Sequence, residues 1–266
     1  MHQILSSFSN EKVKYVSSLK EKKNRDKNNQ FYLEGYREIK KAILSQKIKF
    51  HSLFISYDCF LGTNEDSLIA ELENNNVPIF EIPRKIFEKI SYRDRPDGLI
   101  AICEVPDYEF KGDRLSGNFF AVIEGVEKPG NLGTILRTAE GAGLDGIFIS
   151  DSRLDLFNPN VIRSSTGTLF TLPIYVISIE NIFKIFKQNK IKSLAVTPES
   201  KNIYHKENLN DPIAFIFGSE QYGLTKYSKD NSDNSISIPM KGEADSLNLA
   251  MSAGIIFYET LRQRSI

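Results

Sequence analysis

The sequence has few of the residues that most often carry metal or redox chemistry. Two cysteines, Cys59 and Cys103, are too few for a disulfide framework or a zinc site, and we expect both to be reduced, buried thiols. The three histidines, His2, His51 and His205, are scattered and form no ligand cluster and no obvious Ser-His or Cys-His pair. The sequence therefore argues against a metal site and against triad chemistry.

Long apolar runs are also missing. No stretch is apolar for long enough to cross a bilayer, and no secretory segment follows Met1. The chain has 266 residues, of which 41% are hydrophobic and 26% are charged. This composition is typical of a soluble, globular protein with a substantial core, and we expect a cytoplasmic protein without membrane contact.

The net charge is zero, so the chain as a whole is not a polycation. Positive charge is nevertheless concentrated between Glu11 and Lys27, where seven Lys or Arg residues stand beside three Asp or Glu residues. Such sets occur on solvated helix faces, and they also form phosphate-binding surfaces. A second basic set comprises Arg84, Lys85, Lys89, Arg93 and Arg95.

Predicted strands and helices alternate through the first hundred residues, which favours an α/β layer domain. Asn64 is the expected cap of the helix EDSLIAELENN. Polar residues from Asp107 to Asn118 then break the pattern, and we place a boundary there. The expected domains are 1–108, a linker at 109–118, and 119–266. Strands are predicted at HSLFIS, VPIFEI and GLIAICEV, and helices at KVKYVSSLKEKK, EDSLIAELENN and IPRKIFEKIS, whereas FYLEGYREIKKAILSQ is expected to begin as a short strand and become a helix.

The second half contains nearly continuous apolar runs, as expected for a sheet that is covered on both faces. The last predicted element is the helix SLNLAMSAGIIFYETLRQR, whose small residues Ala250, Ala253 and Gly254 would permit the close approach of another element, including a second subunit. Strands are predicted at FFAVIE, DGIFIS, PIYVIS, KSLAVT, PIAFIF and SISIPM.

The segment GAGLDG matches the dinucleotide fingerprint G-x-G-x-x-G at Gly141, Gly143 and Gly146. That fingerprint requires a strand, then the glycines, then a helix whose N-terminus faces pyrophosphate. Here the order is reversed, because a helical apolar stripe precedes the glycines and a strand follows them. We therefore interpret these glycines as a helix C-terminus, not a phosphate cradle.

The residues before these glycines are more informative. Asn131 is a suitable N-cap, and Arg137 lies off the apolar stripe with Gly133 one turn earlier. Arg137 could contact the backbone of another molecule, or it could be an ordinary exposed arginine.

Two later stretches favour a site. Gly218 follows a buried strand and precedes Glu220, at the sheet edge where open α/β sheets bind ligands. Further on, Ser246 is the expected cap of the last helix, and Asn248 lies in its first turn as a polar residue in a buried setting. Glu220 could instead be a carboxylate that is stabilised near a helix start, and Asn248 could simply cap its helix.

Three motifs together resemble those of the SpoU, or TrmH-like, RNA ribose 2′-O-methyltransferases. They are N-x-G-x-x-x-R-T-A at 131–139, G-S-E-x-x-G-L at 218–224 and I-P-M-x-G-x-x-x-S-L-N at 238–248. LEGYREIKKAI in the first hundred residues is similar to a segment of the family's N-terminal substrate-binding domain. Lys128 departs from the pattern, because many members carry Asp or Asn before this proline.

The resemblance implies a fold and a cofactor. The fold would be a C-terminal SPOUT-type α/β domain with a deep trefoil knot, preceded by a smaller N-terminal α/β substrate-binding domain, in a homodimer. The cofactor would be S-adenosylmethionine, and no metal would be required. The residues expected to hold it are Thr197, Gly218, Ile238, Met240 and Leu247.

The implied reaction is methylation of a ribose 2′-hydroxyl in RNA, with ribosomal RNA favoured over transfer RNA because of the separate N-terminal domain. Arg137 would orient phosphate and lower the pKa of the hydroxyl, since arginine is very hard to deprotonate. Asn131, Glu220, Ser246 and Asn248 would complete the catalytic site, and Lys20, Lys22, Lys23 and Arg163 would contact RNA. The alternative is a catalytically silent RNA-binding or ribosome assembly factor on the same scaffold.

Overall fold

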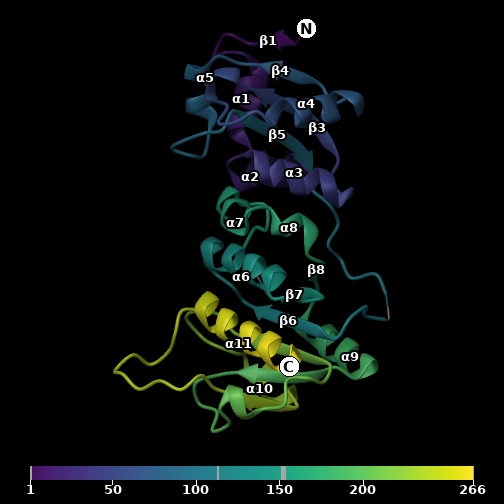
Figure 1. The fold of residues 1–266 in the computed structure, drawn as a ribbon, viewed down its shortest axis with the longest axis vertical. Helices are drawn as coiled ribbons and strands as arrows, with labels where there is room; N and C mark the ends of the chain where they lie inside the picture. Colours follow the sequence, from purple (N-terminus) through teal and green to yellow (C-terminus); the bar gives the residue numbers. More distant parts are fainter. Residues whose placement is uncertain (1, 113, 151–153, 266) are drawn as a thin grey trace. The chain divides into compact units, whose positions relative to one another are not determined.

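The computed structural model describes residues 2–112, 114–150 and 154–265, whose contacts divide the chain into two compact units (Figure 1). Unit 1 comprises Met1–Asp107 and Asp155–Thr171, and unit 2 comprises Tyr108–Leu154 and Leu172–Ile266. The segment Asp155–Thr171 lies in the part of the chain that the sequence assigned to the second domain, yet its contacts are with unit 1.

Unit 1 is built on a mixed sheet with the strand order β1-β4-β3-β5-β2. β1, β4 and β3 are parallel, whereas β5 runs antiparallel to both β3 and β2. The strands are β1 (Gln3–Ile4), β2 (Gln30–Glu34), β3 (Phe50–Ile55), β4 (Ile79–Glu81) and β5 (Leu99–Glu104). The helices are α1 (Glu11–Ser18), α2 (Lys22–Asn28), α3 (Tyr36–Ser45), α4 (Glu65–Asn74), α5 (Arg84–Ile90), α7 (Pro159–Ser165) and α8 (Thr168–Thr171), with a short 3₁₀ turn at Tyr57–Cys59.

Both faces of this sheet are covered, because successive side chains of a strand point to opposite sides. Tyr32 of β2 belongs to a buried cluster with residues of α1 and α5, such as Val16 and Phe87. The neighbouring Phe31 contacts Phe157 and Phe170, with ring centroids 4.5 and 5.8 Å away. The segment 155–171 therefore supplies part of the core of unit 1.

The predicted helix at KVKYVSSLKEKK is interrupted at residues 19–21, which separate α1 from α2 and include the buried Leu19. Serines at positions 17 and 18 are weak helix formers, and the Leu19 carbonyl accepts a hydrogen bond from the Arg25 guanidinium instead of a helical N–H. Lys20 is half-buried and donates to the Ser91 carbonyl at 2.7 Å. The basic segment is therefore a folded corner of unit 1 and not one continuous helix face.

The exposed lysines of this corner have acidic neighbours. Lys22 pairs with Asp26 at 2.7 Å, and Lys23 pairs with Glu21 at 3.0 Å. Exposed pairs of this kind are weak, so both ammonium groups remain accessible to a competing anion. Their contact with RNA stays a prediction.

Unit 2 contains a six-stranded parallel sheet with the order β11-β9-β10-β6-β7-β8. Its strands are β6 (Phe119–Glu124), β7 (Gly146–Ser150), β8 (Ile174–Val176), β9 (Lys192–Val196), β10 (Ile213–Phe217) and β11 (Asn234–Ile236). Its helices are α6 (Pro129–Gly141), α9 (Ile179–Asn189), α10 (Lys226–Asn231) and α11 (Leu249–Arg264), with a 3₁₀ turn at Tyr204–Lys206.

The central strands of unit 2 are buried on both faces, as their continuous apolar runs predict. On one face, Phe120 packs in a cluster with Phe186 of α9. On the other, Phe119 and Phe217 both contact Phe257 of α11, at ring-centroid distances of 6.2 and 5.7 Å. α11 also packs against α6 (Figure 1), so these two helices cover the same face of the sheet.

The interpretation of the GAGLDG segment is confirmed. α6 ends at Gly141, Gly143 has a φ of +76°, and β7 begins at Gly146. Glycine tolerates this positive φ without a steric penalty, which ends the helix before the next strand.

Two local expectations need correction. Asn64 is the N-cap residue of α4, as expected, but its side chain makes no capping bond; instead, Glu65 accepts the backbone N–H groups of Leu61 and Gly62. The strand predicted at SISIPM is shifted, because β11 ends at Ile236, before Pro239, which has no N–H to donate. The small residues of the last helix do permit the close approach of another element: Ala253 is fully buried, and a Cβ on Gly254 would lie 3.6 Å from Thr138 of α6. Their contact with a second subunit stays a prediction.

The two cysteines are buried and unpaired, as predicted. Within 2–112, 114–150 and 154–265, no group of His, Cys, Asp and Glu side chains could hold a metal ion. No helix in these ranges is sufficiently long and apolar to span a bilayer.

The ion pair between Arg25 and Asp155 attaches the segment 155–171 to the rest of unit 1. Arg25 is 3% exposed, and its guanidinium donates to Asp155 from Nε at 2.9 Å and to the Leu19 carbonyl at 2.7 Å. Removing one partner of a buried pair leaves the other charge uncompensated.

Arg25→Ala should therefore lower the free energy of unfolding by about 3 to 5 kcal/mol, measured by urea denaturation. Lys23→Ala, on the same helix but exposed and paired only with Glu21, should change it by less than about 0.5 kcal/mol. An Arg25→Ala protein as stable as the Lys23→Ala control would contradict the anchoring role.

Candidate active site

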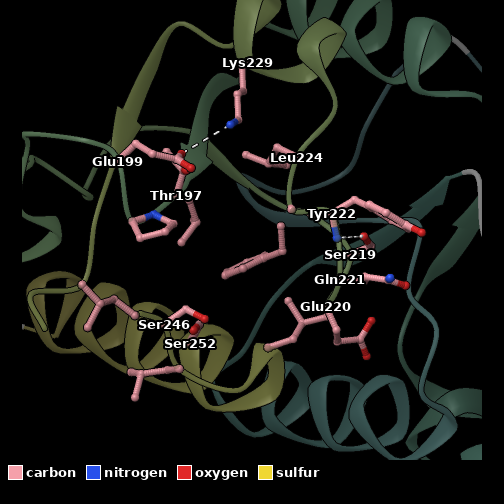
Figure 2. Close-up of a pocket in the computed structure, with 18 of the residues that line it drawn as sticks. Thr197, Glu199, Ser219, Glu220, Gln221, Tyr222, Leu224, Lys229, Ser246 and Ser252 are labelled. Atoms are coloured by element: carbon pink, nitrogen blue, oxygen red, sulfur yellow. Dashed lines mark hydrogen bonds and ion pairs between the residues drawn. The ribbon is translucent and has the colours of Figure 1, made fainter. Parts of the chain in front are cut away.

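A cavity of about 350 Å³ lies at the carboxyl ends of the parallel strands β9 and β10. This edge is where open α/β sheets bind ligands. Its wall continues through the loops that follow these strands and reaches the first turn of α11 (Figure 2). The lining includes Thr197, Pro198, Glu199, Gly218, Ser219, Glu220, Tyr222, Lys229, Ile238, Met240, Ser246, Leu247 and Leu249.

Gly218 allows the loop after β10 to fold tightly against its own strand end. Ser219 and Gly223 exchange two backbone hydrogen bonds at 3.0 Å, and the Ser219 hydroxyl accepts the N–H of Tyr222 at 3.1 Å (Figure 2). A Cβ on Gly218 would lie 2.0 Å from the Gly223 carbonyl carbon and 2.2 Å from the Leu224 nitrogen. No side chain fits there, so glycine is required for this turn.

The Glu220 carboxylate connects this turn to the start of α6. It accepts the Asn131 side-chain amide at 2.7 Å and the backbone N–H groups of Glu127 and Lys128 at 3.0 and 3.2 Å. The Asn131 carbonyl oxygen in turn accepts the Asn248 amide at 3.1 Å. Three loops that are far apart in the sequence are therefore joined by one chain of hydrogen bonds.

Burial by itself would raise the pKa of Glu220, but the hydrogen bonds from Asn131, Glu127 and Lys128 outweigh it and hold this pKa below the ordinary value. The group is therefore ionised at neutral pH and is a weak base. Its stabilising contribution is present above the carboxyl's unfolded pKa and is lost as the pH falls through the lowered folded pKa. Glu220 is suited to positioning neighbouring groups and not to accepting a proton.

Glu124, at the end of β6, anchors the far side of the same loop. Its buried carboxylate accepts the Thr225 hydroxyl at 2.6 Å and the Thr225 backbone N–H at 3.2 Å. Thr225 also caps α10 through its hydroxyl oxygen. The loop from 218 to 225 is therefore fixed at both ends by glutamates.

Two predicted helix caps are wrong. α6 begins one turn earlier than expected, with Lys128 as its N-cap and Pro129 in its first turn, a position that proline favours. Asn131 lies inside that turn, and its side-chain amide donates a hydrogen bond to Glu220. In the last helix the N-cap is Asn248 and not Ser246, because the Asn248 side chain accepts the N–H groups of Ala250 and Met251. Asn248 is also exposed, not buried as expected.

The structure brings most of the predicted site residues together. The five residues predicted to hold a cofactor, Thr197, Gly218, Ile238, Met240 and Leu247, all line the cavity, as do Glu220 and Ser246. Asn131 and Asn248 join them through the hydrogen bonds of Glu220. Arg137 is exposed on α6, as its place off the apolar stripe predicted, but it does not line this cavity.

Sequence reasoning missed one charged pair in the cavity wall. Lys229 and Glu199 approach to 3.3 Å, and the Thr197 hydroxyl donates to the Glu199 carboxylate (Figure 2). The Thr197 hydroxyl, assisted by Lys229, lowers the pKa of Glu199. The position of Glu199 three residues after the end of β9 was a signal that could have identified it.

The remaining predicted contacts lie in unit 1. Arg163 is exposed on α7, within the segment 155–171 that folds with unit 1. Lys20, Lys22 and Lys23 lie at the corner between α1 and α2.

The parallel sheet, the cavity at its strand ends and the hydrogen-bond network around Glu220 define an α/β protein with a polar ligand site. A family model, described as the SpoU rRNA Methylase family, matches residues 118–258, which is more than half of the chain. The protein belongs to this family. Residues 10–101 match a second model, the MRM3-like substrate binding domain.

Relatives match over nearly the whole chain. The 23S rRNA (guanosine(2553)-2'-O)-methyltransferase RlmP of Bacillus subtilis strain 168 is 28% identical over 96% of this chain and 97% of its own. A crystal structure of an RNA 2'-O ribose methyltransferase is 34% identical, with a TM-score of 0.86, over 99% of this chain and 100% of its own. The AdoMet-bound rRNA methyltransferase of Sinorhizobium meliloti is 27% identical, with a TM-score of 0.86, over 98% of this chain and 97% of its own.

The close approach at Gly218 leads to a prediction about the cavity. Gly218→Ala forces the Ser219–Gly223 turn away from the strand end and should weaken S-adenosylmethionine binding at least tenfold, measured by isothermal titration calorimetry. Gly242→Ala is the matched control, because a Cβ there would meet nothing within 4 Å, and its affinity should equal that of the wild type. Equal affinities for both variants would show that the turn does not shape the binding site.

Proposed function

We propose that the protein transfers a methyl group from S-adenosylmethionine to a ribose 2′-hydroxyl of ribosomal RNA. The observation that carries this proposal is the junction of the three family motifs, in which Glu220 holds Asn131, and through it Asn248, beside the Gly218 cavity. Ribosomal RNA is the favoured substrate because the chain combines the SpoU match with a separate substrate-binding match at residues 10–101.

The cavity fits a cofactor that is recognised largely through backbone groups. Gly218 follows β10 and Thr197 follows β9, so both line the cavity at the same sheet edge. Ile238, Met240 and Leu247 supply apolar contact, whereas Glu199 and Lys229 give the wall both signs of charge. When bound, S-adenosylmethionine supplies an electrophilic methyl group, so the protein's task is alignment and removal of the hydroxyl proton.

Each polar residue has a distinct role in the proposed reaction. Arg137 binds phosphate beside the reacting ribose and lowers the pKa of its hydroxyl, since guanidinium remains charged. Glu220 stays anionic and orients Asn131, and Asn131 orients Asn248. Ser246 lies exposed in the cavity wall, where its hydroxyl can contact the ribose or the cofactor.

Two alternatives are separated by simple measurements. A transfer RNA methyltransferase would carry out the same chemistry and would differ only in the RNA that accepts the methyl group. A silent RNA-binding or ribosome assembly factor would bind RNA without binding S-adenosylmethionine. The retained Asn131–Glu220–Asn248 network favours the enzyme over the silent factor.

Family membership supports further proposals about assembly and location. The region after β10 forms a deep trefoil knot, and the protein is a cytoplasmic homodimer. The exposed side chains Met251 and Tyr258 of α11 supply apolar contact in the dimer. The small residues of that helix pack inside the subunit, and this packing is compatible with a second subunit on the same helix.

Substrate affinity comes partly from unit 1. Lys22 and Lys23 are exposed at the α1–α2 corner, and Arg163 is exposed on α7. We expect these groups to contact RNA phosphates, which makes binding salt-dependent. Lys20 contributes less directly, because its ammonium already donates to Ser91.

Arg137→Ala tests the proposed reaction. Its exposed helix position tolerates alanine, and it does not line the cavity, so folding and cofactor affinity should change little. Methyl transfer should fall by at least about a hundredfold, measured as tritium transfer from S-adenosylmethionine to ribosomal RNA. Arg137→Lys should also lose methyl transfer, because an ammonium cannot reproduce the paired N–H donors of the planar guanidinium.

Glu140→Ala, another exposed position on α6, is the control and should retain wild-type transfer. Transfer by Arg137→Ala at the wild-type rate would remove Arg137 from the mechanism. Loss of both transfer and cofactor binding would instead make it a structural residue.

Light scattering tests the dimer. The wild type should have twice the chain mass of 30.2 kDa at micromolar concentration. Met251→Asp combined with Tyr258→Asp places charges on the proposed interface, where the side chains are 61% and 51% exposed, and should give monomers. Leu44→Asp, at a position 67% exposed on α3, should remain dimeric. A wild-type mass of 30.2 kDa would refute the proposal.

A further inference from the structure

Unit 1 contains a cavity of about 700 Å³ that is separate from the active site in unit 2. It lies between the start of α3, the loop before α4, the residues before β5, and α7. The residues that carry the argument are Glu38, Glu65 and Asp97 in one wall, and Arg37, Arg95 and Arg163 at the surface. A cavity of this size can hold one nucleotide.

The acidic wall, formed by Glu38, Glu65 and Asp97, has more negative charge than its neighbours neutralise. All three residues are at most 8% exposed, and each has one carboxylate oxygen without a hydrogen-bond partner among the described residues. The Arg93 guanidinium forms ion pairs with two of them, at nitrogen–oxygen distances of 2.7 Å to Glu38 and 3.6 Å to Asp97.

Glu65 has no cation beside it among the described residues and accepts two backbone N–H groups at 3.2 Å. Unsatisfied buried carboxylate oxygens are costly, so this wall is suited to a ligand that supplies N–H donors.

The arginine rim, formed by Arg37, Arg95 and Arg163, has the opposite character. All three side chains are exposed. In the part of the chain that the structure describes, none makes a hydrogen bond or an ion pair with another residue. Free guanidinium groups present paired donors that match a phosphate. The cavity is therefore bipolar, with an anionic inner wall and a cationic rim.

We infer that this cavity binds one unpaired guanosine nucleotide of the substrate RNA, with its base against the acidic wall and its phosphates on the arginine rim; this inference rests on the proposed function. A guanine presents adjacent ring N–H and amino donors on its Watson–Crick edge, and carboxylate oxygens accept such donors. Asp97 is the residue assigned to this edge, because its buried Oδ1 has no hydrogen-bond partner among the described residues, while its Oδ2 accepts the Tyr36 N–H. The match of residues 10–101 to a substrate binding domain agrees with an RNA ligand in this unit.

Other ligands fit the cavity less well. Inorganic phosphate would use the rim but leave the acidic wall unsatisfied. A simple amine would use the wall but not the rim. Uracil offers a single ring N–H donor and would face the carboxylates with its two carbonyl oxygens. The bipolar arrangement therefore favours a nucleotide, and favours guanine over uracil.

The test uses the full chain and fluorescently labelled seven-nucleotide RNAs, either all uridine or with one central guanosine, and measures binding by anisotropy. The guanosine-containing RNA should bind at least tenfold more tightly. Arg95→Ala combined with Arg163→Ala should weaken binding of both RNAs at least tenfold. Lys49→Ala, at a cation of unit 1 outside the cavity and paired with Glu104, should leave both affinities unchanged.

Asp97→Asn tests the base contact separately. The amide oxygen keeps an acceptor for the Tyr36 N–H, which Asp97 binds at 2.8 Å, while one acceptor oxygen becomes a donor group. The preference for guanosine should disappear while affinity for the uridine RNA is kept. Equal binding of the two RNAs by the wild type, or an unchanged affinity in the double arginine variant, would overturn the inference.

These measurements do not require methyl transfer, so the two proposals can fail independently. Guanosine-selective binding without methyl transfer would contradict the proposed function and support the nucleotide site. Methyl transfer without guanosine-selective binding would support the proposed function and contradict the nucleotide site.

Discussion

The Glu220 carboxylate is the interaction on which the active site depends. It joins the loop after β10 to the first turn of α6, and Asn131 extends the connection to the N-cap of α11. None of these loops would hold its position alone, because each is a short polar segment at a sheet edge. The tight turn at Gly218 places this carboxylate, and Glu124 fixes the other end of the same loop. The lowered pKa of Glu220 follows from these contacts and keeps the junction ionised at neutral pH.

Much of this architecture follows from local sequence. The apolar runs of β6 and β10 predicted a sheet that is buried on both faces, and the glycines after α6 predicted a helix end in place of a phosphate cradle. The motif positions also predicted a cavity beside Gly218, because the residue after a parallel strand lies at the ligand-binding edge. These inferences succeed because periodicity, helix termination and strand-end geometry depend on neighbours in the chain.

Other features depend on contacts that no local pattern contains. Lys128 and not Asn131 caps α6, since Pro129 favours the first turn and Glu220 uses the Asn131 amide. Asn248 and Ser246 are both good capping residues, so composition alone could not choose between them. The pairing of Arg25 with Asp155 spans 130 residues and places the segment 155–171 in unit 1. The Glu199–Lys229 pair in the cavity wall likewise needs the folded loops to be recognised.

The central claim is that this protein places a methyl group on a ribose 2′-hydroxyl of ribosomal RNA. The most direct measurement is a ribose-methylation map of total RNA from cells with and without the protein. The account predicts that a 2′-O-methylated nucleotide of ribosomal RNA is lost when the protein is absent and is restored when the wild-type chain is supplied. Identical maps in the two cells, or a loss confined to transfer RNA, would contradict it.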